Sequence, residues 1–254
     1  MTRRPCFILS FFLTLIFCGN SFGGEEQSAL LRLPLVPSGE EIRHRPLTSV
    51  LSNLGSRVRG GYVLFAVEVF LRQGKEPNVS LAGKPAGELG TALGEVLCQL
   101  PDYDMQVASA HLIEIFPRSA RSDRQDLLNL RLATFDVADV SATTIIAHPR
   151  RFIPELSARL SPKAPVSRRL ESYTGPFSIP GRLITLRLRD VTLREILNRV
   201  SKATEQCGHD QGPVGWVYRV NSDDTPGVAK HSWQVLSSLP SDWRDYLNSA
   251  NRSE

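Results

Sequence analysis

The chain has 254 residues, with 30 lysines and arginines against 26 acidic residues, so its formal net charge is only +4. This small excess does not predict the strong positive field of a nucleic-acid-binding protein, so nucleic acid is not an expected partner. Hydrophobic residues make up 41% of the chain, a share that is typical of a globular protein with one large or two small domains.

The first 23 residues have the layout of a secretory signal peptide. Two arginines precede an apolar run over residues 7–18, which is shorter than the roughly 20 residues that a membrane-spanning helix needs. Ser21 and Gly23 place small side chains at the positions that a signal peptidase reads. We therefore expect cleavage before Gly24, a periplasmic or secreted location, and no transmembrane segment in the mature chain.

Cleavage at that position would leave 28 basic and 26 acidic residues, a formal charge of +2, and two of the four cysteines. A lipid anchor at Cys18 is not expected, because Phe17 is bulkier than the residue that a lipoprotein site requires. Cys98 and Cys207 can form a disulfide in an oxidising compartment. The alternative is that Cys98, on the apolar side of a predicted helix, is a buried small hydrophobic residue.

The first half of the mature chain alternates predicted helices and strands. Apolar residues at helical spacing predict one helix that begins near Leu47 and ends before Gly60, and a second, clearer one from Leu89 to Leu100. Runs of strand-forming residues predict the remaining elements, which are strands at 62–67, 78–81, 105–108 and 112–116.

The polar segment 118–126 has no apolar residue except alanine and predicts a solvated linker between two domains. Beyond it we expect strands at 128–135 and 183–188, helices at 153–160 and from Leu193, and a hairpin of 215–220 with 232–236. Thr192 and Glu195 have the spacing of a capping box at the start of the second of these helices. The expected domains are 24–117 and 127–240, with a proline-rich insertion at 161–181 and a tail at 241–254.

The two halves share a pattern that predicts an internal repeat. Val79-Ser80-Leu81 and Ile184-Thr185-Leu186 are each followed by a turn, an amphipathic helix and a pair of strands. Helices in such units must cover one face of a sheet. The sequence therefore predicts an α+β fold of two small βαβ-containing domains, with helices packed on short mixed sheets.

The first unit resembles the short N-terminal domain of secretins and TonB-dependent receptors. The resemblance covers about residues 46–117 and depends on the helix opened by Pro46-Leu47, the strand around Val79-Ser80-Leu81, and the helix and closing strand after it. The second unit, at about 128–236, is similar to a degenerate copy, because Thr192-Leu193-Arg194-Glu195-Ile196-Leu197 matches the second helix of the same module.

The resemblance implies a periplasmic docking or signalling domain that contacts a partner protein and has no catalytic residues or cofactor to transfer. With no sequence for a secretin ring or a receptor barrel before Glu254, we expect an adaptor, sensor or free-standing partner in the bacterial cell envelope. This expectation follows from fold-level analogy.

One short segment suggests a different function. Cys207, His209 and Asp210 bring a thiol, an imidazole and a carboxylate within four residues, a combination that could bind a metal or support a thiol nucleophile. The more common structure for such a segment is a polar loop beside a hairpin. A periplasmic metal-binding protein or enzyme centred on Cys207 and His209 is therefore an alternative, although the five histidines show no pair at metal-ligand spacing.

Two further groups could form an interaction face. Arg187 and Arg189 alternate along a predicted strand and could meet an acidic partner or the cell wall, although a solvated strand face is the commoner role of such residues. Trp216, Tyr218 and Trp233 could present an exposed aromatic surface or pack across strands in the core. A third mode of contact is pairing at a sheet edge, which needs no particular side chain, and it is the mechanism that we favour.

Overall fold

The computed structural model describes residues 29–39, 41–82, 87–160, 183–205, 212–221 and 230–240. The predicted signal peptide, the proline-rich insertion and the C-terminal tail lie outside these residues. Helices and short mixed sheets alternate along the chain, which confirms the predicted α+β class. None of the helices in the described ranges is long and apolar enough to cross a membrane.

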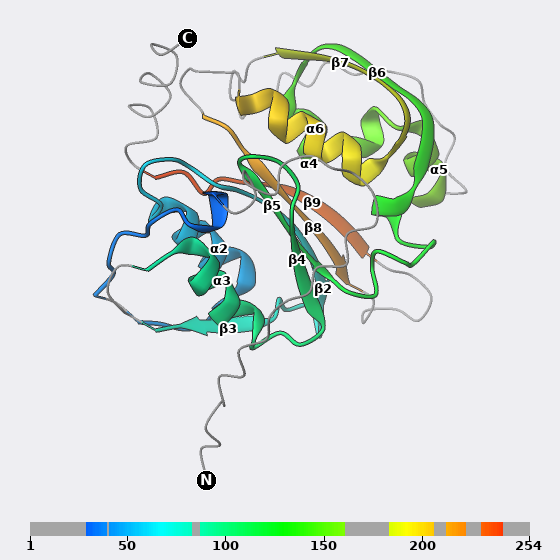
Figure 1. The fold of residues 1–254 in the computed structure, drawn as a ribbon. Helices are drawn as coiled ribbons and strands as arrows, with labels where there is room; N and C mark the ends of the chain where they lie inside the picture. The colour runs from blue at the N-terminus through cyan, green and yellow to red at the C-terminus, as the bar shows by residue number, and fades with distance from the viewer. Residues whose placement is uncertain are drawn as a thin grey trace, which may run out of the picture.

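Five strands form a mixed central sheet in the order β4–β5–β2–β8–β9 (Figure 1). The central strand β2 (Leu64–Leu71) is parallel to β5 (Leu112–Pro117) at one edge and to β8 (Gly215–Asn221) at the other. The outer strands β4 (Tyr103–Val107) and β9 (Lys230–Leu236) are antiparallel to β5 and β8 respectively. Six consecutive residues of β2 are buried, as expected for a strand covered on both faces.

The division of the chain into two separate domains was wrong. Strands β2, β4 and β5 come from the expected first domain, whereas β8 and β9 come from the expected second domain, and all five share one sheet. The physical reason lies in β2, whose apolar side chains face both sides and whose two edges both need a hydrogen-bonding neighbour. The second half provides one of these neighbours and the cover for one face.

One face of the central sheet is covered by two helices and a two-stranded ribbon. The helices α2 (Leu47–Ser56) and α3 (Leu89–Leu97) turn their apolar residues toward β2, β5 and β8 and bury them in one core. The strands β1 (Ile42–Pro46) and β3 (Asn78–Leu81) pair antiparallel beyond the helices. This half of the molecule therefore has three layers, which are ribbon, helices and sheet (Figure 1).

The opposite face carries a similar arrangement built from the second half of the chain (Figure 1). Its helices pack between the central sheet and a second antiparallel ribbon, and their apolar residues form a second core on that face. The elements of this half, with two 3₁₀-helices, are η1 (Leu127–Asn129), β6 (Arg131–Ser141), α4 (Ala142–Ala147), η2 (Pro149–Arg151), α5 (Pro154–Leu160), β7 (Leu183–Thr192) and α6 (Leu193–Glu205).

Each of the strands β1, β6 and β7 contains a residue with a positive φ angle shortly before the strand leads into a helix. His44, Asp139 and Asp190 have positive φ angles of 48°, 54° and 52°, and a helix begins three residues after each of them. Aspartate and histidine are among the residues that tolerate this backbone region best. After the third of these residues the predicted capping box is confirmed, because Thr192 N–H donates to Glu195 Oε2 at 2.7 Å and Glu195 N–H donates to Thr192 Oγ1 at 3.2 Å.

Most residues of the segment 118–126 are exposed, as predicted, but the segment joins elements that pack on the same central sheet, so it is not a linker between separate domains. Ala120 is fully buried and Asp126 is 7% exposed. The guanidinium of Arg121 lies 4.2 Å from the centre of the Phe116 ring and pairs with the buried Glu114. The sequence predicts that the charged residues of this segment face solvent, but the side chains of Arg121 and Asp126 contribute to a polar network inside the protein.

Candidate functional site

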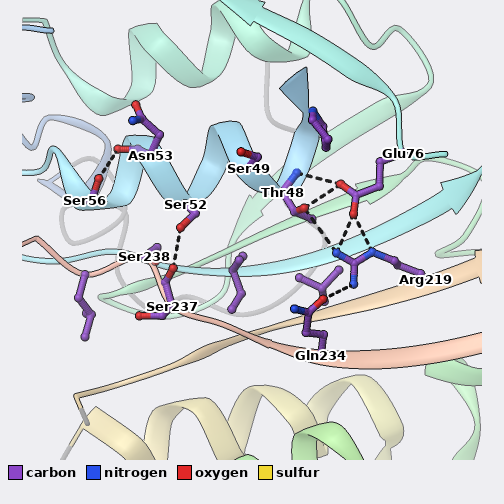
Figure 2. Close-up of a pocket in the computed structure, with 14 residues that line it drawn as sticks. Thr48, Ser49, Ser52, Asn53, Ser56, Glu76, Arg219, Gln234, Ser237 and Ser238 are labelled. Atoms are coloured by element: carbon purple, nitrogen blue, oxygen red, sulfur yellow. Dashed lines mark hydrogen bonds and ion pairs between the residues drawn. The ribbon is translucent and has the colours of Figure 1, made fainter. Parts of the chain in front are cut away.

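A polar groove lies between α2 and the neighbouring strands β8 and β9 (Figure 2). Its volume is about 630 Å³. Ser49, Ser52 and Ser56 recur at helical spacing along α2 and form one wall together with Asn53, because residues three, four and seven apart share a side of a helix. Gln234 of β9 lies on the opposite wall (Figure 2).

One end of the groove is closed by a fixed network around Glu76. Arg219 of β8 forms an ion pair with Glu76 at 2.6 Å, and their side chains are only 18% and 11% exposed. The other carboxylate oxygen of Glu76 accepts from the Thr48 hydroxyl at 2.7 Å and from Thr48 N–H at 3.1 Å. Pro46 precedes α2 and provides no side-chain cap, so Glu76 takes this role from the loop before β3. Arg219 also donates to Gln234 at 2.8 Å.

A second set of contacts fixes α2 to the segment that follows β9. The Ser52 hydroxyl donates to the Ser237 carbonyl at 2.7 Å, and the Ser238 hydroxyl donates to the Val63 carbonyl at 2.7 Å. A Cβ atom on Gly55 would lie only 2.3 Å from the Ser238 carbonyl oxygen, so this close approach requires glycine. The groove is therefore held at both ends, and its two charged groups are already paired with each other.

The strand beside this groove forms one outer edge of the central sheet. Among the described residues, β9 pairs with β8 alone. Its side chains alternate: Ser232 and Gln234 lie on the α2 side, whereas His231, Trp233 and Val235 lie on the α4 side, across from Val220, Tyr218 and Trp216. Half of the backbone N–H and C=O groups of an edge strand point away from the sheet, so β9 offers a row of hydrogen-bonding groups next to the groove.

A cluster of charged side chains lies buried between β2 and α6. Arg194 of α6 donates to Glu68 of β2 at 2.8 Å, and their side chains are 5% and 0% exposed. Glu68 is also in hydrogen-bonding reach of Asp126, and burial together with that neighbour raises the pKa of Glu68 to about 8. Within the described part of the chain, Glu68 Oε1 and Asp126 Oδ2 have no donor, and a proton shared between the two carboxyls would satisfy both.

A second buried carboxylate extends this network. Glu114 of β5 is 2% exposed and accepts from Arg121 and from Asn198 of α6. The Asn198 side chain also accepts from the Trp216 indole N–H at 3.0 Å. Burial lowers the pKa of Arg121 to about 10. Because Glu68, Glu114 and Arg194 are nearly inaccessible to solvent, this network joins the two halves of the chain and offers no surface to a ligand.

The aromatic residues of the expected interaction face are not exposed together. Trp216 and Tyr218 are 0% and 1% exposed and Trp233 is partly exposed, so the alternative of an exposed aromatic surface is wrong and the alternative of packing across strands in the core is confirmed. They pack across the β8–β9 pair, where the rings of Tyr218 and Trp233 are 5.1 Å apart. This cross-strand packing buries the large rings in the second core.

Arg187 and Arg189 are exposed on β7, as predicted for a strand face. Arg187 lies 3.7 Å from Asp136 on the paired strand β6, and Asp190 pairs with Arg131 at 2.6 Å. Neighbouring acidic residues therefore reduce the positive charge of this ribbon. The arginines also lie on a different sheet from Trp233, so the structure does not bring the predicted face together.

Cys98 is exposed near the end of α3, so the interpretation of it as a buried hydrophobic residue was wrong. Its thiol lies 3.1 Å from the Glu95 carbonyl oxygen. Cys207, His209 and Asp210 lie outside the described residues, so the disulfide and the metal or thiol site remain predictions. Within the described ranges, no group of three or more histidine, cysteine or acidic side chains is arranged to hold a metal ion.

The groove and the network at its end were missed at the sequence level. The only local signal was the spacing of Ser49, Ser52 and Ser56 on the polar side of a predicted helix, and hydroxyls there are most often solvated. Nothing in the sequence links Glu76 to Arg219, because they are distant in the chain and meet only when β8 joins the central sheet.

Comparison with known proteins adds no relative, since no protein-family model, no curated protein and no solved structure matches this chain.

Proposed function

We propose that this protein is a non-catalytic interaction module of the bacterial cell envelope, which acts in the periplasm as an adaptor or sensor by binding a partner protein. The observation that supports it best is the outer edge of β9, which pairs with no further strand in the described part of the chain and lies beside a groove whose charged groups are already paired. Binding by edge pairing uses backbone groups, so it requires none of the side-chain constellations of a catalytic site.

The order of elements in the first half also supports the proposal. A helix from Leu47, the strands β2 and β3, the helix α3 and the strand β5 occur in the order that the resemblance to the secretin and TonB short domain implies. That resemblance is to a docking module of the periplasm, which agrees with the leader-like first 23 residues.

The test is to express the full chain in a Gram-negative host and follow both its location and its contacts. We expect the mature protein in the periplasmic fraction with Gly24 as its first residue by mass spectrometry. A photoreactive amino acid at Ser232 on β9 should cross-link to one envelope protein reproducibly, whereas the same group at Ala133 on β6 should not. Retention of residues 1–23 in the cytoplasm would contradict the proposed location, and equal cross-linking at both positions would contradict a specific partner.

A further inference from the structure

We propose that the outer edge of β9 binds an extended segment of the partner as an added strand, and that this segment alternates uncharged polar residues with apolar residues. This inference rests on the proposed function, and it specifies the chemistry of the segment that the protein recognises. Three features of the structure support this proposal: the backbone of β9, the groove on the α2 side of β9, and the apolar surface on its α4 side.

The two outer strands of the central sheet differ in how their edges are occupied. On β4, the Asp104 carboxylate accepts from Met105 N–H at 2.9 Å and lies 3.9 Å from Arg118, so a side chain and charges occupy that edge. Charged side chains on edge strands oppose the addition of another strand. The strand β9 carries one exposed charged residue, Lys230, at its first position; after it, the only titratable side chain is His231, whose pKa is lowered by burial. We infer that β9, which spans seven residues, is the receptive edge.

On the α2 side, an added strand would turn alternate side chains into the groove of about 630 Å³. Its wall presents the hydroxyls of Ser49 and Ser52 and the amide of Asn53 (Figure 2). Glu76 and Arg219 neutralise each other at the closed end, so no charge is left for a charged side chain to pair with. A charged side chain would lose hydration there without gaining a partner. Small hydroxyl or amide side chains therefore fit this side.

On the α4 side, the neighbouring side chains of β9 are Trp233 and Val235, which are half-buried and pack on the second core. Helix α4 contacts β9 on this face. An apolar side chain at the next strand position would extend this surface and cover more of the Trp233 ring, since cross-strand aromatic and β-branched pairs stabilise sheets. The added strand would thus be polar toward α2 and apolar toward α4.

The experiment uses the mature protein and fluorescein-labelled seven-residue peptides of known sequence. The first peptide alternates threonine with valine, the second has the same composition in two blocks, and the third replaces each threonine with aspartate. We expect fluorescence anisotropy to show at least tenfold tighter binding of the first peptide, which corresponds to about 1.4 kcal/mol. Backbone amide NMR shifts caused by this peptide should map to β9 and the adjoining groove.

Three single-residue variants test whether the peptide binds at the edge of β9. Ser232→Lys on β9 and Ser49→Lys on α2 should each weaken binding of the alternating peptide about tenfold or more, because they add an unpaired charge beside the strand. The matched control is Ala133→Lys, which adds the same charge at an exposed position of β6 and should change the affinity less than about twofold. Circular dichroism of the three variants should be the same as that of the parent protein, so that a loss of binding reports on the site.

Equal binding of the alternating and block peptides would overturn the proposed chemistry. Amide shifts on β4 instead of β9 would overturn the assigned edge, and a β9-dependent dimer at working concentration would identify a second copy of the chain as the occupant. If the peptide binds at β9 while Ser232 gives no specific cross-link in cells, the docking edge stands and the envelope function fails. If the cross-link forms but the peptide does not bind, the function stands and this edge chemistry fails.

Discussion

The two faces of the central sheet are built on different chemistry, although both are covered by helices and a two-stranded ribbon. The face beneath α2 and α3 is apolar, with Phe65, Val67 and Val69 of β2 pointing into it. The opposite face has Leu64, Ala66 and Glu68 of the same strand, and Glu68 meets Arg194 of α6. One strand therefore contributes to an apolar core on one side and to a buried ionic network on the other.

The comparison shows that the stability of a packed face and the specificity of its packing can come from different interactions. Burial of apolar side chains stabilises the packing of α2 and α3 on the sheet. Because this effect is not directional, it depends little on which helix supplies the side chains. A buried ion pair stabilises little in itself, but it penalises any arrangement that leaves one charge alone. Glu68 and Glu114 come from the first half and Arg194 from the second, so the network favours the packing of α6 on this face.

The largest effect is expected from breaking the charged face. Arg194→Ala leaves Glu68 and Asp126 buried without a cation and should lower the free energy of unfolding by about 3–5 kcal/mol. Urea denaturation at neutral pH measures the loss. Arg187→Ala is the control, because Arg187 is exposed and its ion pair with Asp136, at 3.7 Å, lies in solvent. This substitution should lower the free energy of unfolding by about 0.5 kcal/mol or less. Similar losses in the two variants would argue against an ionic network at this face.

Breaking the apolar face should cost slightly less. Leu51→Ala removes a fully buried side chain of α2 and leaves a cavity, so we expect a loss of about 3 kcal/mol in the same urea experiment. Leu183→Ala is the matched control, since that leucine is 57% exposed and its truncation should change stability by about 0.5 kcal/mol or less. A small loss at Leu51 would mean that the first core tolerates a cavity at this position.

The pH dependence of stability should distinguish the two faces further. Burial raises the pKa of Glu68 from its ordinary value of 4.5 to about 8, so between these pH values the folded state holds a proton that the unfolded state has released. Raising the pH through this window therefore favours unfolding, by about 1.4 kcal/mol for each pH unit over which the folded state retains the proton. Burial also raises the pKa of Glu205, to about 7, which adds a change of the same sign.

Glu68→Gln should flatten this dependence, because a glutamine keeps a neutral group at the same position over the whole pH range. Urea denaturation at several pH values between 4.5 and 8 measures the slope. The control Glu95→Gln changes an exposed residue of α3 and should leave the slope unaltered. A slope that survives in Glu68→Gln and disappears in Glu205→Gln would assign the effect to the end of α6 instead.

The smallest effect is expected at the groove. Glu76→Ala removes the side chain that caps α2 and leaves Arg219 without its partner, so the free energy of unfolding should fall by about 1 kcal/mol. Glu88→Ala is the matched control, because Glu88 precedes α3 without forming a side-chain cap. An equal response of both variants would show that Glu76 contributes no specific capping.

Local patterns in the sequence predicted most of the elements correctly. Apolar spacing identified α3 and α6, the strand β3 was predicted at its observed bounds, and Thr192 with Glu195 forms the capping box. Helix α4 and the full length of β6 were not predicted, because the strand ends at Ser141 and the helix begins at Ala142 without glycine or proline to mark the change.

The candidate site was predicted less well than the elements. Edge pairing was favoured from the sequence, but the choice between a surface and a core position was left open for Trp216 and Tyr218, and the groove was missed. An alternating strand shows which residues share a side, but it does not show whether a helix will cover that side. Here the pairing of β8 with β2 and the packing of α6 bury both rings.

The sequence by itself determined the leader-like first 23 residues, the α+β class and the places where many helices and strands begin, because charge, caps and periodicity act over a few residues. Only the tertiary structure decided that the two halves share β2, that Glu68 meets Arg194, and that α2 and β9 enclose a groove. Parallel pairing of β2 with β8 joins segments far apart in the chain. A buried strand with two apolar faces carries no local signal of which strands will lie beside it.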